Sequence, residues 1–442
     1  MGPQVDPVPE DDSRPDSADV VIIGGGIIGV SAALFLAKSG VSVALCEKGY
    51  IAGEQSSRNW GWCRRMGRDP RELPLIVEAL KLWPQMEELT GTDVGFRRSG
   101  ILYLCENDAD IAHQENWLKI AGDHALDTHI IDGAALSALM PGATRSYRAA
   151  LYTPSDGRAE PQKAAPAIAR AARRAGAHIL ANCAVREIET TGGRISGVVT
   201  EKGAIRTGTV IIAGGAWSSH LCGSLGIRLP QLVVRASVMR TGPVEGGPDN
   251  AAWGRNLAYR KRLDGGYTIA DGMLNYHHIV PGSFRYLSDF LPMLMQDWRM
   301  VRLRAGMDFF TGPFGLKPST DPDQTVYEQH RTLDPMPATA RLDEVHRKME
   351  EVFPLLKGAP VLQRWAGFID TTPDAVPVIS PVQSLPGLVI ATGFSGHGFG
   401  IGPAAGRLAA NLATGDSPIV DPKPFRYERF IDGTKPRPTT GV

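Results

Sequence analysis

Residues 20–29 read VVIIGGGIIG, and this short segment is the best guide to the architecture of the chain. Its four β-branched residues predict a strand that is buried on both faces of a parallel sheet. Residues 30–40 carry apolar side chains at helical spacing and stop at Gly40, and residues 41–47 predict a second strand. Strand, glycine turn, helix and strand together form a right-handed βαβ unit.

The glycine turn has the spacing G-x-G-x-x-G, with Gly24, Gly26 and Gly29 at the three positions. The first glycine permits a tight turn, the second lets the backbone approach a pyrophosphate, and the third lets helix and strand pack closely. Glu47 ends the second strand, where a carboxylate accepts hydrogen bonds from ribose hydroxyls. The pattern predicts dinucleotide binding. The alternative is that the glycines only pack the helix against the sheet.

Two later segments repeat the pattern of a buried strand followed by a glycine turn. Residues 209–218 read TVIIAGGAWS, and residues 387–393 read GLVIATG and lead into a helix of small residues over 402–414. We therefore predict an α/β fold with a discontinuous nucleotide domain. Its three segments are residues 19–66, 151–230 and 361–442.

The intervening stretches, residues 67–150 and 231–360, are predicted to form a second domain. Residues 100–104 and 265–270 resemble antiparallel strands with turns. Residues 281–340 are rich in Met, Arg, Phe and Pro and have no clear period, so a lid, an oligomer contact and an insertion all fit this segment.

Composition and charge exclude several classes of protein. The 442 residues include 47 Lys+Arg and 47 Asp+Glu, a balance that argues against nucleic-acid binding. No apolar run of transmembrane length occurs. The five cysteines form no CxxC or CxH pair, so we predict no metal site and expect reduced thiols in a cytoplasmic protein. Residues 1–18 are acidic and proline-rich and predict a disordered lead.

Five motifs together resemble the flavin-dependent amine and amino-acid oxidases of the D-amino-acid oxidase, glycine oxidase and sarcosine oxidase family. They are Val21–Gly29, Gly53–Gly61, Ile212–Ser218, Thr372–Ile379 and Gly393–Gly400. The last motif, GFSGHGFG, is the most specific of them. The resemblance covers nearly the whole chain. It implies a Rossmann-like FAD-binding domain and a second, α+β substrate domain built on an antiparallel sheet.

The resemblance implies that residues of all three nucleotide segments hold FAD. The glycines of the first turn would hold the diphosphate, Glu47 the adenosine ribose, and the Gly393–Gly398 turn the flavin N1–C2=O edge, where reduced flavin carries negative charge. The residues assigned to FAD are Gly24, Gly26, Ile27, Ile28, Gly29, Glu47, Lys48, Ser56, Ser57, Arg58, Asn59, Gly61, Trp62, Val185, Ala213, Gly214, Trp217, Gly393, Gly396, His397 and Gly398.

Three positions depart from the family pattern. Relatives similar to glycine and D-amino-acid oxidases carry an Arg for the substrate carboxylate where this chain has Ile369. Sarcosine-oxidase-like relatives carry a Lys where this chain has Gly400, and the cysteine that binds flavin covalently in them aligns near Gly367. We therefore expect noncovalent FAD and a different cation for any substrate carboxylate.

Arg64 and Arg65 are the first candidates for that cation, because they closely follow the flavin loop and a guanidinium suits a carboxylate. Contact with FAD phosphate or with surface acids is the alternative. Asp370 could attract a substrate ammonium or cap a turn, and His397 could act at the flavin or pack in its turn. Further candidates for the pocket wall are Tyr259, Arg260, Tyr267, His277 and His278, and Lys261 is a weak candidate for promoting reaction with oxygen.

The resemblance implies oxidation of a C–N bond of an amino acid, or of an N-methylated or secondary amine, to an imine by hydride transfer to flavin N5. Two alternatives stay open: a flavoenzyme acting on a 2-hydroxy acid, and a flavin-carrying subunit of a multi-subunit amine dehydrogenase. An NAD enzyme is a weaker interpretation. We expect a small-molecule substrate and oxygen or another electron acceptor, and the sequence allows a homo-oligomer or a small partner subunit.

Overall fold

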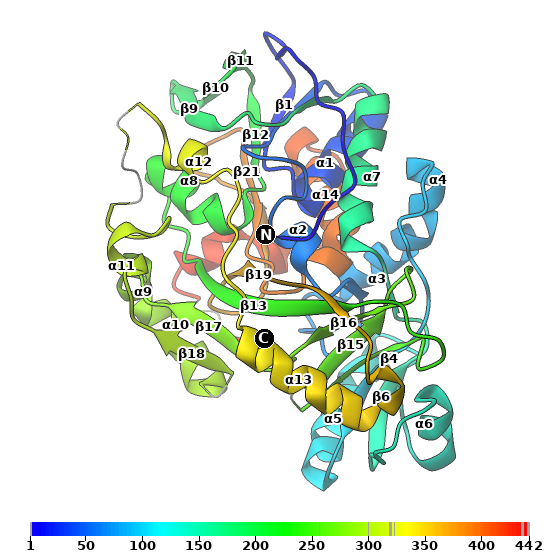
Figure 1. The fold of residues 1–442 in the computed structure, drawn as a ribbon. Helices are drawn as coiled ribbons and strands as arrows, with labels where there is room; N and C mark the ends of the chain where they lie inside the picture. The colour runs from blue at the N-terminus through cyan, green and yellow to red at the C-terminus, as the bar shows by residue number, and fades with distance from the viewer. Residues whose placement is uncertain are drawn as a thin grey trace.

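The structure is a computed structural model, and it describes residues 2–255, 257–298, 300–317, 321, 323–434 and 437–439. Two large sheets organise the molecule. Figure 1 shows the sheet that contains β1, β12 and β21 in the upper half and the sheet that contains β13, β15 and β16 in the lower half.

The first sheet has six strands and is parallel except at one edge. In spatial order the strands are β20 (Val378–Pro381), β21 (Leu388–Thr392), β12 (Thr209–Ile212), β1 (Val20–Ile23), β2 (Val43–Cys46) and β8 (His178–Leu180). Only β20 runs antiparallel to its neighbour, β21. Every residue of β1 and β2 is buried, as the continuous apolar runs predict.

Three helices pack beside one another on this sheet: α1 (Ile27–Lys38), α7 (Pro161–Arg174) and α14 (Gly398–Thr414). Because α1 lies between the other two helices, ten of its twelve residues are buried. Small residues of α14 permit the close approach. A Cβ at Gly406 would lie 2.7 Å from the Ala32 nitrogen and 2.8 Å from the Ile28 oxygen.

The second sheet has ten strands, most of them antiparallel. Its order is β18 (Val301–Arg304), β17 (Asn275–His278), β13 (Leu232–Thr241), β16 (Tyr267–Ala270), β15 (Leu257–Lys261), β14 (Ala251–Gly254), β4 (Ile101–Cys105), β6 (Ala149–Thr153) and β5 (His129–Ile131), with β19 (Val361–Thr371) paired to β13. Helix α13 (Thr339–Val352) packs against this sheet and buries Leu342, Val345 and Met349 in a shared apolar cluster.

Further strands and helices complete the fold. The strands are β3 (Trp62–Cys63), β7 (Gly157–Arg158), β9 (Val185–Thr191), β10 (Arg194–Thr200) and β11 (Gly203–Arg206). The helices are α2 (Gln55–Arg58), α3 (Leu73–Leu82), α4 (Met86–Thr90), α5 (Asp108–Asp123), α6 (Gly133–Leu139), α8 (Ser218–Ser224), α9 (Pro281–Arg285), α10 (Leu287–Asp297), α11 (Asp308–Thr311) and α12 (Val326–Gln329).

All six strands of the parallel sheet come from the three segments predicted for the nucleotide domain, 19–66, 151–230 and 361–442. Strand β19 also lies in the third segment, but it pairs along β13 in the other sheet. The chain therefore crosses between the sheets within residues 371–378. The division into two domains itself stays a prediction.

The N-terminal segment differs from the expectation of a disordered lead. Residues 2–18 lie along α7 and β8, where Asp11 Oδ1 pairs with Arg173 Nη2 at 2.8 Å and Asp11 Oδ2 accepts from the Ile179 N–H at 2.8 Å. Ser17 forms a β-bridge with Arg206. Asp6, Glu10 and Asp11 form ion pairs with Lys163, Lys202 and Arg173.

Residues 281–316 form α9, α10, β18 and α11 at the edge of the large sheet, where β18 pairs in parallel with β17. Parts of the 281–340 segment, residues 299, 318–320 and 322, lie outside the described residues. Over the described ranges, none of the helices combines the length and the apolar character that a membrane crossing requires.

Candidate functional site

Two cavities adjoin between the sheets. The first runs along the glycine turns that follow β1 and β12 and the end of β2. The second has a volume of about 540 Å³ and is bounded by residues of α5, β13 and the segments near β3 and β17. The cavities share part of their walls, namely Gln55, Asn59, Ile369, Gly396 and Phe399.

The turn after β1 is a cradle of bare backbone. A Cβ at Gly24 would collide with the Ala213 oxygen, and Gly24 has a φ of 111°. A Cβ at Gly29 would collide with the Gly24 oxygen, and one at Gly26 would lie 3.0 Å from Ser56 Oγ. The three glycines therefore leave no side chain of their own in the turn, and the N-terminus of α1 faces the cavity, where it suits a phosphate group. Ser56 Oγ accepts from the Ile27 N–H at 2.8 Å at the same helix end.

Glu47 braces the same turn. Its Oε2 accepts from the Gly25 N–H at 2.7 Å and its Oε1 from the Gly49 N–H at 2.8 Å. Burial raises the pKa of the Glu47 carboxyl above its usual value. A carboxylate has about four acceptor positions, so Glu47 can still accept from ribose hydroxyls.

Lys48 lines the first cavity, but its ammonium already has protein partners, one carboxylate and two backbone oxygens. Lys48 Nζ pairs with Glu54 Oε1 at 2.6 Å and lies 5.0 Å from the centre of the Trp217 ring. It also donates to the oxygens of His330 and Arg331, at 2.7 and 2.9 Å. Lys48 therefore joins the cavity wall to the 330–331 segment.

The turn after β21 forms the far side of the first cavity. Asp370 Oδ2 accepts from the Gly393 N–H at 2.7 Å, from Thr392 Oγ1 at 3.1 Å and from Gln231 Nε2 at 3.3 Å. Burial raises the pKa of Asp370. Asp370 lines the first cavity and not the second, and its carboxyl holds the turn, in line with the capping alternative. Its contact with a substrate ammonium stays a prediction.

Most of the residues predicted for FAD line the first cavity: Gly24, Gly26, Ile27, Ile28, Glu47, Lys48, Ser56, Asn59, Val185, Ala213, Gly214, Trp217, Gly396 and Gly398. Others line only the second: Arg58, Gly61, Trp62 and His397. Gly29, Ser57 and Gly393 line neither. Gly29 packs helix against strand, Ser57 is fully buried with Oγ donating to the Glu54 oxygen, and Gly393 is bound to Asp370.

The first cavity fits FAD. It combines a side-chain-free cradle at the start of α1, a carboxylate at the end of β2, and the N-terminus of the 17-residue helix α14 next to Gly396 and Gly398. That helix end suits the negative charge of a reduced flavin. Five further lining residues were not assigned to FAD from the sequence. Glu54, Gln55 and Phe394 lie within two of the five motifs, whereas Tyr327 and Phe368 lie outside all of them.

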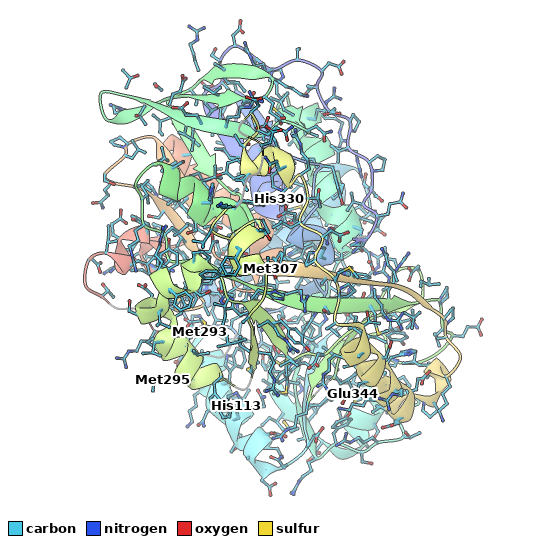
Figure 2. The ribbon with its side chains drawn as sticks, turned by 60° about the vertical axis from the view of Figure 1, so that its left-hand side comes forward. His113, Met293, Met295, Met307, His330 and Glu344 are labelled. Carbon is cyan, nitrogen blue, oxygen red and sulfur yellow. The ribbon has the colours of Figure 1, made fainter. Side chains whose placement is uncertain are left out.

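The second cavity has an aromatic wall and three arginines. Its aromatic residues are Trp60, Trp62, Tyr103, Trp117, Trp253 and Phe399. Helices α5 and α10 flank it, with His113 from the first and Gln296 from the second in the lining. Figure 2 shows His113 on α5 together with Met293 and Met295 on α10, on the same side of the molecule.

The three arginines differ in their partners. Arg58 Nη1 pairs with Asp334 at 2.7 Å, and Arg68 Nη1 lies 3.6 Å from Glu72 Oε2. Arg64 donates to the Met66 oxygen, lies 5.7 Å from the centre of the Tyr103 ring, and places Nη2 3.3 Å from His397 Nε2. Among the residues that the structure describes, no carboxylate lies within ion-pair distance of Arg64.

Arg65, the other candidate for binding a substrate carboxylate, is instead paired with Asp156. Its Nε lies 3.1 Å from Asp156 Oδ1, and its backbone N–H donates to the same carboxylate. Asp156 is completely buried. Arg65 therefore serves the fold, and it does not line either cavity.

His397 connects the Arg64 side of the second cavity to a buried acid. Its Nδ1 lies 2.8 Å from Glu72 Oε2, and Glu72 is fully buried. Burial lowers the pKa of His397 to about 4, with Arg68 and Arg64 acting in the same direction and Glu72 opposing them. His397 is therefore neutral at pH 7.

The tyrosine and histidine candidates for the pocket wall lie elsewhere, which corrects that prediction. Tyr259 and Tyr267 are buried in the cluster beneath α13, and their hydroxyls donate to Asn250 Oδ1 at 3.2 Å and the Pro248 oxygen at 3.0 Å. His277 lies between the Val233 oxygen and Ser283 Oγ, each at 2.8 Å. An alternating strand pattern does not reveal which face meets the ligand.

The remaining strand candidates also have other partners. Arg260 forms a buried ion pair with Glu160, with Nη1 2.7 Å from Oε1. His278 pairs with Asp308, and Lys261 Nζ donates to the oxygens of Val244 and Gly246.

Packing explains two of the departures from the family pattern. A Cβ at Gly400 would lie 3.0 Å from the Trp62 oxygen and 3.2 Å from Arg68 Nη2, so Arg68 fills the space that a lysine would need. A Cβ at Gly367 would collide with Gln55 Oε1. Ile369, the third position, lines both cavities.

Residues 19–412 match the model of the DAO family, described as FAD dependent oxidoreductase. The chain belongs to this family. Sarcosine oxidase subunit beta of Arthrobacter sp. is 28% identical over 94% of this chain and 92% of its own length. The structure of L-amino acid deaminase from Proteus myxofaciens in complex with anthranilate is 35% identical, with a TM-score of 0.91 over 97% of both chains.

A second deaminase structure, from Proteus vulgaris, is 30% identical, with a TM-score of 0.88 over 95% of this chain and 99% of that one. The family match and these relatives confirm the predicted fold class and the predicted FAD-dependent oxidoreductase. They also support the predicted oxidation of a C–N bond of an amine or amino acid.

Proposed function

We propose that this DAO-family enzyme oxidises the C–N bond of an α-amino acid that has a bulky apolar side chain and is bound through its carboxylate at Arg64. The observation that carries the proposal is the state of Arg64, a cation that lines an aromatic cavity and has no carboxylate partner among the described residues. A guanidinium in such a place favours a carboxylate ligand.

The second cavity, which the flavin would share with the substrate, has six aromatic residues in its wall, more apolar surface than glycine or sarcosine alone would contact. Indole and phenol rings such as those of Trp60, Tyr103 and Trp253 favour an aromatic or branched aliphatic side chain. The similar deaminase structure holds anthranilate, an aromatic carboxylate, which agrees with this ligand class.

FAD, held by the first cavity, supplies the hydride acceptor. In the proposed reaction Arg64 binds and orients the substrate carboxylate, and the aromatic wall excludes water from the reacting carbon. The substrate loses a hydride and a proton, and the resulting imine takes up water to give a keto acid and ammonia. No side chain needs to act as a base if the amine arrives neutral.

The test is anaerobic mixing of the holoenzyme with a substrate panel while the flavin absorbance is recorded. We expect L-phenylalanine or L-leucine to bleach the flavin, and sarcosine and 2-hydroxy acids to react poorly. Bleaching by sarcosine or by a hydroxy acid alone would contradict the proposal and favour one of the alternatives. D-amino acids complete the panel and define the stereochemistry.

Arg64→Ala should raise the KM for the amino acid by at least about tenfold, because a desolvated charge pair is lost. Lys357→Ala, on an exposed turn, is the control and should behave as wild type. An unchanged KM in Arg64→Ala would show that Arg64 does not bind the substrate carboxylate.

The finer points of attachment, assembly and location are also proposals. Noncovalent FAD is supported by the absence of a cysteine at position 367, and release of yellow FAD on acid precipitation tests it. A partner subunit is suggested by the relative named as a subunit beta, and co-purification tests it. A cytoplasmic location rests on the five cysteines, all of which are free.

A further inference from the structure

A buried hydrogen-bonded chain, Glu72–His397–Arg64, leads from beneath α3 to the wall of the second cavity. Glu72 precedes the first residue of α3, and His397 precedes the first residue of α14. The steps are 2.8 Å from Glu72 Oε2 to His397 Nδ1 and 3.3 Å from His397 Nε2 to Arg64 Nη2. Of these three residues only Arg64 and His397 line the cavity, so Glu72 acts there through the His397 ring and through Arg68, whose Nη1 lies 3.6 Å from Glu72 Oε2.

The direction of each hydrogen bond follows from the neutral ring. A neutral imidazole has one donor and one acceptor nitrogen, and the partner of one nitrogen determines the role of the other. A carboxylate can only accept, so Nδ1 carries the proton and donates to Glu72. The Nε2 lone pair is then left to accept from Arg64, which has only donors.

A neutral acceptor is a suitable partner for a ligand-binding guanidinium. A carboxylate in the same place would hold Arg64 equally well but would cancel much of its charge. An imidazole lone pair fixes the direction of one N–H bond and leaves the full positive charge for a ligand. The cavity keeps this charge, because the acid of the chain lies one ring further away.

We infer that Glu72 and His397 are positioning residues: Glu72 fixes the His397 ring so that the Nε2 lone pair aims Arg64 at the substrate carboxylate. The inference rests on the proposed function, since it needs an anionic group at Arg64. Glu72 and His397 touch neither the substrate carboxylate nor the reacting carbon in this scheme.

Arg68 binds the backbone of two members of the chain, Arg64 and His397. Its Nε donates to the Arg64 oxygen at 3.1 Å, and its Nη2 donates to the His397 oxygen at 3.3 Å. The residues on either side of His397, Gly396 and Gly398, line the first cavity. The same turn thus contributes to the flavin site and aligns the carboxylate-binding residue.

Two substitutions at position 397 separate the two hydrogen bonds of the ring. An asparagine amide can replace Nδ1 and keep the bond to Glu72, but it offers no acceptor at the Nε2 position. A glutamine places its oxygen near the Nε2 position and can still accept from Arg64. Glu72→Gln removes the charge that selects the tautomer and leaves the ring in place.

The test measures the affinity for benzoate, which is detected through the change that binding causes in the flavin spectrum. Benzamide, which has the same ring but no charge, is the comparison ligand. His397→Asn and Glu72→Gln should each weaken benzoate binding about tenfold and leave benzamide binding unchanged. His397→Gln should regain most of the benzoate affinity. In turnover, the KM for the amino acid should rise in His397→Asn and Glu72→Gln and stay close to the wild-type value in His397→Gln, while kcat changes little in all three.

FAD content and melting temperature show whether each variant is folded, and Glu88→Gln on the exposed face of α4 is the matched control. The inference is overturned if Arg64→Ala weakens benzoate binding but His397→Asn and Glu72→Gln do not. Equal losses of benzoate and benzamide binding would overturn it too. If Arg64→Ala itself binds benzoate normally, the carboxylate contact of the proposed function fails first.

Discussion

The charge state of His397 governs how the cavity around Arg64 responds to pH. Glu72, Arg68 and Arg64 are the charged groups that act on the ring; Glu72 and Arg64 contact it directly. Burial lowers the pKa of His397 to about 4 from an ordinary 6.5, so the folded protein binds this proton less readily than the unfolded chain. Between these values the unfolded state holds more protons, and stability therefore rises with pH.

We predict that His397→Gln makes the melting temperature less sensitive to pH between about 4.5 and 6.5, because this proton is then absent from both states. The measurement is a series of thermal melts of holoenzyme across that range. His129→Gln, at an exposed position in β5, is the control and should keep the wild-type slope. An identical slope in both variants would show that His397 carries its proton equally in the folded and unfolded states.

Arg64 and Arg65 show what a residue pattern alone leaves undecided. The sequence places both next to the flavin loop, and both have the chemistry that a carboxylate requires. The distinction comes from Asp156, which is distant in sequence, completely buried, and bonded to the Arg65 side chain and backbone. Long-range ion pairs of this kind leave no local signal.

At the scale of the elements, the packing of α1 against α14 depends on glycines of α14, and Gly406 makes the closest backbone contact. Gly406 lies in the middle of α14, where alanine would normally favour the helix. A Cβ there would press on Ser31, the Ala32 nitrogen and the Ile28 oxygen. Because two of these atoms belong to the backbone of α1, the helices would have to separate.

Gly406→Ala should therefore destabilise the enzyme by about 1–3 kcal/mol, as overpacking does in other cores. The same substitution at Gly223, an exposed position of helix α8, meets no atom within 4 Å and should be neutral or slightly stabilising. Urea unfolding of both variants gives the comparison. Equal effects at the two sites would show that the helices can move apart at little cost.

The strands and turns of the predicted nucleotide domain could be predicted because the residues that specify them are close together in the sequence. A four-residue apolar strand, three spaced glycines and a terminal acid specify β1, the turn and Glu47 without reference to the rest of the chain. The predicted substrate domain has no such local sequence patterns. Tyr259 and Tyr267 lie on strands as expected, but only the position of α13 shows that their side chains face the core.

At the scale of the whole molecule, the first cavity gathers turns from the beginning, middle and end of the chain. Gly24, Gly53, Ala213 and Gly396 all line it, although the first and last are 372 residues apart. Bound FAD would therefore connect segments that are otherwise joined through the parallel sheet and its helices. A ligand that binds only the folded state stabilises it by mass action.

Removal of FAD should lower the free energy of unfolding by about 2.7 kcal/mol when the holoenzyme is compared at a free FAD concentration 100 times its Kd. Hydrogen exchange should locate the change. Amides of residues 24–29, 53–61, 213–217 and 393–398 should lose protection together, because each segment contributes to the first cavity. Amides of α13 and of the strands beneath it should change little, because their apolar cluster lies apart from the cavity. Loss of protection confined to one of the four segments would contradict a single ligand held by all of them.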